Sequence, residues 1–194
     1  MSKLLIPGGS GFLGMQLARH FSQKGWKVCV LSRSKKANKE GIYFVQWDGK
    51  SLGDWCKQLD TTQVVVNMAG RSVNCRYNEK NKKEILDSRV QSTRILGQAI
   101  AQATQQPTVW INSSSATIYE DTRSDMPSND EYEGKLGNDF SPSICKAWEN
   151  EFFGASVAGV RQVAMRTAIV IGKEPGGALE YLINLTKLWL GGTQ

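Results

Sequence analysis

Four glycines lie within seven residues near the start of the chain, in the segment Gly8-Gly9-Ser10-Gly11-Phe12-Leu13-Gly14. Because glycine lacks a Cβ, Gly8 permits a sharp turn, Gly11 lets a pyrophosphate approach the backbone, and Gly14 lets a helix pack close to a strand. The segment follows a predicted strand and opens a predicted helix, whose free amides and positive dipole end attract phosphate. The spacing therefore predicts a dinucleotide site lined by Gly8, Gly11, Phe12, Leu13 and Gly14.

The second predicted strand ends in Ser32 and Arg33, where NAD-binding folds usually carry an acidic residue for the ribose 2′-hydroxyl. An arginine here offers a planar fork for a 2′-phosphate, and Ser32 adds a hydroxyl donor. This favours NADP (NADPH) over NAD. An alternative is a basic, solvated turn made of Arg33, Lys35 and Lys36. Asp48, past the third predicted strand, either accepts a hydrogen bond from adenine or simply turns the chain before a glycine.

Two further groups of polar or small residues come at the ends of predicted strands. Met68, Ala69 and Gly70 follow a buried strand at the carboxyl edge of the predicted sheet, where such folds bind ligands. Ser113, Ser114 and Ser115 follow the next strand, and their hydroxyls are able to bond a nicotinamide and a substrate carbonyl. The alternative is that these serines cap a loop or satisfy backbone groups.

An α/β fold is needed to bring these segments together. Short apolar runs alternate with segments of helical periodicity, which indicates a doubly wound parallel sheet covered by helices on both faces, an NAD(P)-binding Rossmann fold. The strands are predicted at Lys3 to Pro7, Lys27 to Ser32, Tyr43 to Gln46, Gln63 to Asn67, Thr108 to Asn112 and Gln162 to Arg166. The helical stripes are Leu13, Leu17 and Phe21, then Leu86, Val90, Thr93, Gly97 and Ile100, then Ile144, Trp148 and Phe152. Gly25 is the predicted C-cap of the first helix, and residues 120–138 are a predicted surface loop.

Composition narrows the class of protein. The chain has 194 residues, of which 40% are hydrophobic, enough for one core. Its formal charge of +6 comes from basic residues interleaved with acidic ones, so we expect no nucleic-acid partner. The four cysteines lack the spacing of a zinc or redox motif, so no metal site is expected. Without a signal peptide or a membrane-spanning stretch, the sequence predicts a cytoplasmic protein with no membrane partner.

Several motifs together resemble the extended short-chain dehydrogenase/reductase superfamily. The similarity is greater to its atypical, epimerase-like, NADP-binding branch, within the NAD-dependent epimerase/dehydratase family. The resemblance extends over nearly the whole chain. It is carried by the glycine segment 8–14, Leu31-Ser32-Arg33, Val66-Asn67-Met68-Ala69-Gly70, the stretch Lys83 to Val90, Ser113-Ser114-Ser115-Ala116-Thr117-Ile118-Tyr119, Cys145-Lys146-Ala147-Trp148-Glu149 and the stretch Arg166 to Gly172.

The resemblance implies roles for individual residues. Ser115 matches the catalytic serine or threonine of the superfamily. From the residues alone, Glu84 and Arg89 are equally well interpreted as exposed helix charges. Cofactor contacts are implied for Ser32 and Arg33 at the adenosine phosphate, Met68 and Ala69 along the middle of the cofactor, Glu84 and Arg89 within its reach, and Val170 near the nicotinamide.

The sequence departs from the superfamily at the proton donor. Reductases of this kind use a tyrosine and a lysine four residues later on one helix. Here Ser141 and Cys145 align with those positions, and Lys146 lies one step further round the helix. Tyr119 is a candidate substitute phenol, although a packing role for its ring is an equally good interpretation.

A second departure concerns the end of the chain. Residues 1–172 are the predicted cofactor domain, and residues 173–194 are expected to begin a C-terminal substrate-binding region that is truncated here. Leu182, Leu185, Leu188 and Trp189 predict an amphipathic last helix, whose uncovered apolar side is able to pair with another subunit in a homodimer.

Taken together, these features predict an NADP(H)-dependent oxidoreductase or a nucleotide-sugar-epimerase-like protein. Hydride would pass between nicotinamide and a carbonyl or hydroxyl carbon of an unknown small-molecule substrate. The alternative is a non-catalytic NADP(H)-binding regulatory or interaction module, because the usual tyrosine and lysine are missing.

Overall fold

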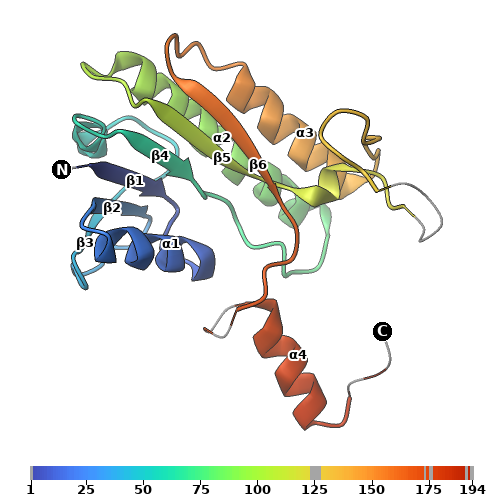
Figure 1. Ribbon diagram of the computed structural model, residues 1–194. Helices are drawn as coiled ribbons and strands as arrows, with labels where there is room; N and C mark the ends of the chain where they lie inside the picture. Colours follow the sequence, from blue (N-terminus) through green and yellow to red (C-terminus); the bar gives the residue numbers. More distant parts are fainter. Residues whose placement is uncertain (1, 123–127, 173, 175–176, 191, 193–194) are drawn as a thin grey trace.

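A computed structural model of the chain describes residues 2–122, 128–172, 174, 177–190 and 192. Within these residues, six parallel strands form one sheet in the order β3-β2-β1-β4-β5-β6 (Figure 1). The direction of strand order reverses between β1 and β4, which is where doubly wound folds bind ligands. The strands are β1 (Lys3–Pro7), β2 (Lys27–Ser32), β3 (Ile42–Gln46), β4 (Val64–Asn67), β5 (Val109–Ser115) and β6 (Arg161–Thr167). The predicted doubly wound parallel sheet is thus confirmed.

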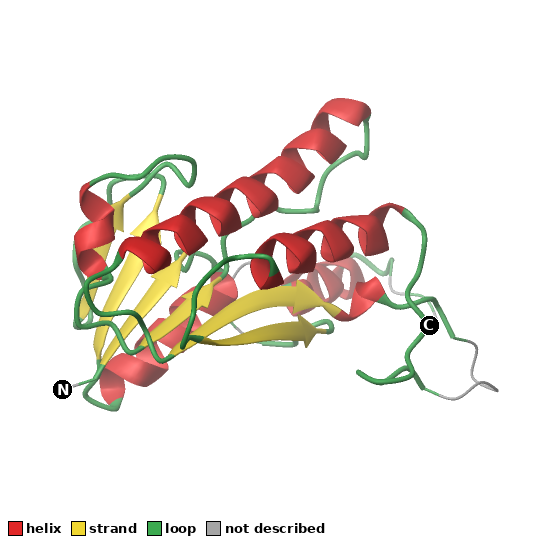
Figure 2. Cartoon of the chain, turned by 90° about the horizontal axis from the view of Figure 1, so that it is seen from above, coloured by secondary structure: helices red, strands yellow, loops and turns green. Residues whose placement is uncertain are grey.

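Helices cover both faces of this sheet. Helices α2 (Glu79–Gln102) and α3 (Phe140–Phe153) lie side by side on one face, and α1 (Phe12–Gln23) lies on the other (Figure 2). Two short 3₁₀ helices, η1 (Asp54–Gln58) and η2 (Ala116–Ile118), follow β3 and β5. Helix α4 (Ala178–Lys187) stands away from the sheet (Figure 1).

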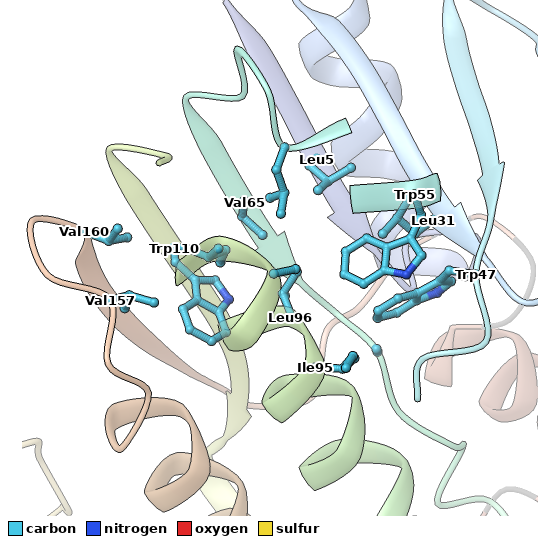
Figure 3. Close-up of a cluster of buried hydrophobic side chains, with 14 of the residues drawn as sticks. Leu5, Leu31, Trp47, Trp55, Val65, Ile95, Leu96, Trp110, Val157 and Val160 are labelled. Atoms are coloured by element: carbon cyan, nitrogen blue, oxygen red, sulfur yellow. The ribbon is translucent and has the colours of Figure 1, made fainter. Parts of the chain in front are cut away.

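The larger hydrophobic cluster lies between the sheet and helices α2 and α3. Leu5 and Val65 of the central strands, together with Leu96 of α2 and Trp110 of β5, are completely buried (Figure 3). A smaller cluster packs Ala18 of α1 against the opposite face of the sheet. Because strands covered on both faces have no solvent side, they are recognisable in sequence as continuous apolar runs.

The end of α1 follows the predicted glycine chemistry. Gly25 adopts φ +78°, its amide donates to the Ser22 carbonyl, and the Trp26 amide donates to the Phe21 carbonyl at 3.0 Å. This pair of bonds is the Schellman arrangement, in which a left-handed glycine satisfies the last carbonyls of a helix. Gly25 thus closes the helix as predicted, although it lies one residue after the C-cap itself, Lys24.

Strand β5 is longer than the sequence predicted. It continues three residues beyond Asn112, because β6 pairs with it as far as Ser115 opposite Thr167. The three serines therefore belong to the strand itself. Their side chains alternate, so Ser114 is buried on the α3 side while Ser113 and Ser115 lie on the other side. The predicted ends of β3, β4 and β6 differ from the observed ones by a single residue at one or both ends.

The last helix and the loop 120–138 were also predicted from the sequence. Helix α4 ends at Lys187, so Leu188 and Trp189 of the predicted stripe lie past its end, and Trp189 has φ +58°. The described parts of the predicted loop 120–138 contain no helix or strand, although Leu136 forms an isolated bridge with Tyr119. Residues 123–127 of this loop lie outside the described residues.

Large apolar side chains are exposed on and after α4, and Trp189 is 95% exposed. The other exposed apolar side chains of this region are Tyr181, Leu182, Ile183, Leu185, Leu188 and Leu190.

None of the helices in the described part of the chain is long and apolar enough to cross a membrane.

Candidate functional site

The glycine turn after β1 is held between two neighbouring strands. Gly8 adopts φ +73°, and a Cβ on it would lie 2.5 Å from Cα of Ala69. Its amide donates to the Leu31 carbonyl at 2.9 Å, and the Met68 amide donates to the Pro7 carbonyl at 2.8 Å. Only glycine fits a position that is both left-handed and pressed against another backbone. The turn is therefore fixed relative to the ends of β2 and β4.

The start of α1 opens toward the same edge of the sheet. Gly11 is the N-cap, with no side-chain cap hydrogen bond, and the first turn carries no acidic residue. A Cβ on Gly11 would meet no heavy atom within 4 Å, so space remains above its backbone. Gly14 packs directly on the backbone of Gly9. The free amides of this helix end are suited to an anion such as a pyrophosphate.

Two cavities flank this turn and share Gly8 and Gly11 in their linings. The β2-side cavity, of about 550 Å³, is also lined by Ser10, Ser32, Arg33, Trp47, Asp48, Gly49, Lys50, Ala69, Gly70, Arg71, Ser88, Gln91 and Ser92. The β5-side cavity, of about 600 Å³, is also lined by Phe12, Leu13, Gly14, Met68, Ser72, Val73, Tyr77, Arg89, Ser113, Ser114, Ser115, Thr117, Phe140, Ser141, Ile144, Cys145 and Trp148. The two cavities together contain most of the predicted cofactor residues.

The β2-side cavity contains a free cation. Arg33 is exposed, and its guanidinium has no hydrogen-bond or ion-pair partner among the residues that the structure describes. Ser32 is buried beside it, with its Oγ 3.5 Å from the Oγ of Ser10. Asp48 accepts hydrogen bonds from the Lys50 and Ser51 amides at 2.8 and 2.9 Å, and from the Ser51 hydroxyl. These bonds lower the pKa of Asp48 and confirm its turn-forming role.

Two predicted cofactor residues do not line these cavities. Glu84 pairs with Arg71, which also donates from Nη2 to Asn81 at 2.9 Å. Arg71 itself lines the β2-side cavity. Val170 lies in the coil after β6 and is absent from the lining of both cavities. The roles of Glu84 and Val170 stay predictions.

Arg89 is the cation of the β5-side cavity. Its Nη1 donates to the carbonyls of Arg71 and Ile85 at 3.0 and 3.1 Å, and its Cζ lies 5.1 Å from the ring centroid of Trp148. Burial lowers its pKa, an effect that the nearby Cys145 and Tyr77 partly offset. Within the described residues it has no carboxylate partner. A half-buried positive charge without an acid partner is suited to an electron-rich ligand.

The hydroxyl of Ser115 is oriented by its neighbour. Its Oγ accepts hydrogen bonds from the Thr117 amide at 3.2 Å and from the Thr117 hydroxyl at 2.9 Å. Because a hydroxyl has two acceptor lone pairs and one proton, these bonds leave the Ser115 proton free. Ser115 therefore has a hydrogen-bond donor to offer to a ligand in the β5-side cavity.

A third cavity, of about 1170 Å³, adjoins the β5-side cavity. The two share Ser115, Thr117 and Ser141. Tyr119 lines the third cavity, and its Oη accepts a hydrogen bond from Nη1 of Arg166 at 2.6 Å. Tyr119 is absent from the lining of the β5-side cavity.

Arg166 is held by a buried carboxylate. Its Nε and Nη2 donate to the two oxygens of Glu149 at 3.0 and 2.9 Å, while the Ser114 hydroxyl donates to the same carboxylate at 2.6 Å. Burial by itself would raise the pKa of Glu149, but the bonds from Arg166 and Ser114 outweigh it and the pKa is lowered. This paired arrangement fixes α3 to the ends of β5 and β6.

Comparison with known proteins gives the same assignment as the motifs. The family model described as the NAD dependent epimerase/dehydratase family matches residues 4–184. The chain belongs to this family. Among curated members, the epimerase family protein YfhF of Bacillus subtilis is 31% identical over 191 residues, covering 98% of this chain and 61% of the relative. Human epimerase family protein SDR39U1 is 29% identical, with the same shares. The chain thus spans about three-fifths of the length of these relatives.

Solved structures of the family share the fold. The crystal structure of human SDR39U1 with NADPH matches with a TM-score of 0.81 at 28% identity, covering 98% of this chain and 61% of that one. A nucleoside-diphosphate sugar epimerase from Corynebacterium glutamicum matches with a TM-score of 0.77 at 30% identity, covering 100% of this chain and 38% of that one. The resemblance inferred from the motifs is confirmed.

At the positions aligned with the tyrosine and the lysine of the superfamily, this chain has a serine and a cysteine. Ser141 and Cys145 both line the β5-side cavity. Burial raises the pKa of Cys145, so its thiol is protonated at neutral pH. The Nζ of Lys146 donates to the Gly137 carbonyl at 2.8 Å, outside that cavity. Neither Cys145 nor Lys146 therefore places a positive charge in the β5-side cavity, as the aligned lysine of the superfamily would.

Sequence reasoning missed two cations of the β2-side cavity. Arg71 directly follows the Met68 to Gly70 segment, and Lys50 follows the Asp48 turn. Extending each ligand-edge segment by one or two residues would have included both. In the described part of the chain no cluster of three or more His, Cys, Asp or Glu residues is suited to hold a metal ion.

Proposed function

We propose that residues 1–172 are an NADP(H)-binding domain of a reductase-like or epimerase-like protein, and that residues 173–194 begin its substrate-binding region. The observation that carries the cofactor choice is the free guanidinium of Arg33 beside Ser32 at the end of β2, inside the β2-side cavity. A carboxylate at this place would repel a 2′-phosphate, whereas an unpaired arginine attracts it.

The cavities and the glycine turn fit the parts of this cofactor. The 2′-phosphate and adenosine would lie in the β2-side cavity against Ser32, Arg33 and Lys50. The pyrophosphate would lie over Gly11 and the first amides of α1. The nicotinamide half would lie in the β5-side cavity with Met68 and Ser113. The presence of NADPH in the similar human structure supports this choice.

The proposed reaction uses few groups of this chain. The bound nicotinamide would supply or accept a hydride. Ser115 would donate a hydrogen bond to the oxygen of the reacting carbonyl, and this oxygen would take its proton from solvent water when the carbonyl is reduced. Arg89 would provide the positive charge that the missing lysine gives elsewhere in the superfamily. Glu84 would act through Arg71, which it holds at the β2-side cavity.

A second candidate function is a non-catalytic NADP(H)-binding module. The observation that favours it is the presence of Ser141 and Cys145 at the positions of the proton donor and its lysine. A serine hydroxyl is a much weaker acid than a phenol, so it does not replace tyrosine unaided. In this case Tyr119 serves only to pack the loop at Gly134, against which its ring lies.

Fluorescence titration with NADPH and NADH tests the proposal. We expect NADPH to bind more tightly, and Arg33→Ala to lower its affinity about 10-fold to 100-fold, the loss of one charge-assisted contact. NADH affinity should change little. Arg161→Ala, which removes an exposed arginine at the start of β6, is the matched control and should change neither. Equal affinity of the unsubstituted chain for both nucleotides, or no binding of either, would refute the proposal.

A further inference from the structure

A buried hydrogen-bond network lies under the cofactor edge of the sheet, with Thr93 of α2 at its centre. Thr93 is completely buried, and its Oγ1 accepts two hydrogen bonds. One comes from Nδ2 of Asn67 at the end of β4, at 3.0 Å, and the other from Nε1 of Trp148 in α3, at 2.8 Å. A single hydroxyl thus joins a strand end to two helices.

One branch of this network reaches the turn after β4. Asn67 is completely buried, and its Oδ1 accepts the Ala69 amide at 3.1 Å. Its Nδ2 also donates to Oδ1 of Asn112 at 2.7 Å, which joins β4 to β5. These bonds fix the backbone at Ala69, which lines the β2-side cavity next to Gly70.

The other branch reaches the charge of the β5-side cavity. The ring of Trp148 lies against the Arg89 guanidinium, with 5.1 Å from Cζ to the ring centroid. Arg89 in turn lies on Gly70, because a Cβ there would be 3.1 Å from its Cζ. The contacts therefore form a closed ring, which runs from Thr93 through Trp148, Arg89, Gly70, Ala69 and Asn67 back to Thr93.

The chemistry of the network points to positioning as well as packing. A valine has nearly the shape of threonine, and it would fill the same space without any polar group. Threonine is required only if the donors of Asn67 and Trp148 need an acceptor, since a buried donor without a partner is costly. The Trp148 ring also lies against Arg89, and Asn67 also accepts the Ala69 amide, and both Arg89 and Ala69 line the cavities proposed for the cofactor.

We propose that Thr93 is a positioning residue for the nicotinamide half of the cofactor. It acts on this half through Trp148, whose ring lies against Arg89 in the β5-side cavity, while its bond with Asn67 joins it to the end of β4. The inference rests on the proposed function, because it assumes that NADP(H) occupies the two cavities. Thr93 touches neither cavity itself.

The test compares two nucleotides and four variants. NADPH fills both cavities in the proposed binding mode, whereas 2′,5′-ADP has no nicotinamide half. Thr93→Val should weaken NADPH binding about tenfold, the effect of losing about one net hydrogen bond, and leave 2′,5′-ADP binding unchanged. Thr93→Ser, which keeps the hydroxyl, should restore NADPH affinity to within about twofold. Trp148→Phe, which removes the donor of this branch and makes the ring beside Arg89 smaller, should weaken NADPH binding in the same selective way.

Thr62→Val is the matched control for a purely structural effect. Thr62 is also buried, and its hydroxyl donates to the Gln58 carbonyl at 2.6 Å, away from both cavities. It should lower the melting temperature without changing the affinity for either nucleotide. If Thr93→Val weakens both nucleotides equally, weakens neither, or behaves like Thr62→Val, the positioning role is wrong. If the unsubstituted chain binds neither nucleotide, the proposed function fails first, and this inference fails with it. If Thr93→Val does not fold, binding of NADPH and 2′,5′-ADP to Trp148→Phe tests the positioning role instead, and equal or unchanged affinities for the two nucleotides would refute it.

Discussion

Gly70 lies directly against the guanidinium of Arg89. A Cβ on Gly70 would be 3.1 Å from Cζ and 3.3 Å from Nη1 of that side chain. The same guanidinium also lies against the Trp148 ring and donates to the carbonyls of Arg71 and Ile85. The absence of a side chain at position 70 therefore determines where the only described cation of the β5-side cavity lies.

Gly70→Ala should shift Arg89 and weaken NADPH binding severalfold, and it should weaken 2′,5′-ADP binding less, although Gly70 itself lines the β2-side cavity. The reason is that the new methyl group must displace a side chain already held by two hydrogen bonds. Isothermal titration with both nucleotides measures this. Gly53→Ala is the control, because a Cβ there meets only the Trp55 ring at 3.8 Å in an extended backbone. Unchanged NADPH affinity in Gly70→Ala would contradict the prediction.

Gly8→Ala should destabilise the fold and abolish nucleotide binding. Gly8 and Gly25 have similar positive φ values, +73° and +78°, but only Gly8 is pressed against another backbone, at Ala69. We expect Gly25→Ala to lower the free energy of unfolding by about 1 kcal/mol, the cost of strain alone. Gly8→Ala should lower it by about 3 kcal/mol or more, because the overlap adds to the strain. Urea denaturation measures both; equal losses in the two variants would show that close approach does not matter.

Glu149→Gln should destabilise the chain and remove part of its sensitivity to acid. The pKa of Glu149 in the folded chain is below its ordinary value of 4.5. Its carboxylate therefore stabilises the fold fully above about pH 4.5, and this contribution is lost as the pH falls through the lowered pKa. Removing one partner of this buried pair should cost about 3 kcal/mol at pH 7, since Arg166 loses its counter-charge.

Urea denaturation at pH 7 and pH 4 tests the titration of Glu149. The unsubstituted chain should lose more stability on acidification than Glu149→Gln does. Glu131→Gln, a change at an exposed carboxylate, is the control and should lose as much stability on acidification as the unsubstituted chain. The titration argument fails if Glu149→Gln and the unsubstituted chain lose the same amount.

Ser115→Ala should lower NADPH-dependent reduction of any active carbonyl compound about 100-fold, since it removes the hydrogen bond offered to the substrate oxygen. NADPH affinity should stay within about threefold. The measurement is NADPH oxidation over a panel of aldehydes and ketones. Ser143→Ala removes a hydroxyl that bonds the Phe140 carbonyl, outside the β5-side cavity, and is the control. Full turnover in Ser115→Ala would exclude a catalytic role for this serine, and no turnover by the unsubstituted chain would favour the binding module.

Local sequence patterns predicted much of this fold correctly. β1 and β2 were predicted at their observed bounds, because a buried parallel strand is a continuous apolar run ended by a turn. The turn at Gly8 and the close packing at Gly14 were also interpreted correctly, since Gly8 has a positive φ and Gly14 packs on the backbone of Gly9, five residues earlier. The end of β5 was predicted too early because its last residues are held by pairing with β6, just over fifty residues later.

The sequence by itself therefore determined the family, the parallel sheet and the turn suited to phosphate, all of which depend on short-range spacing. Only the tertiary structure decided which charges are free. Arg33 is unpaired in the described structure, whereas Glu84 is occupied by Arg71 and Arg166 by Glu149. It also decided that Thr93, one member of an apolar stripe in sequence, accepts hydrogen bonds from Asn67 and Trp148. Such pairings join residues far apart in the chain, and they leave no periodic signal because packing alone brings the partners together.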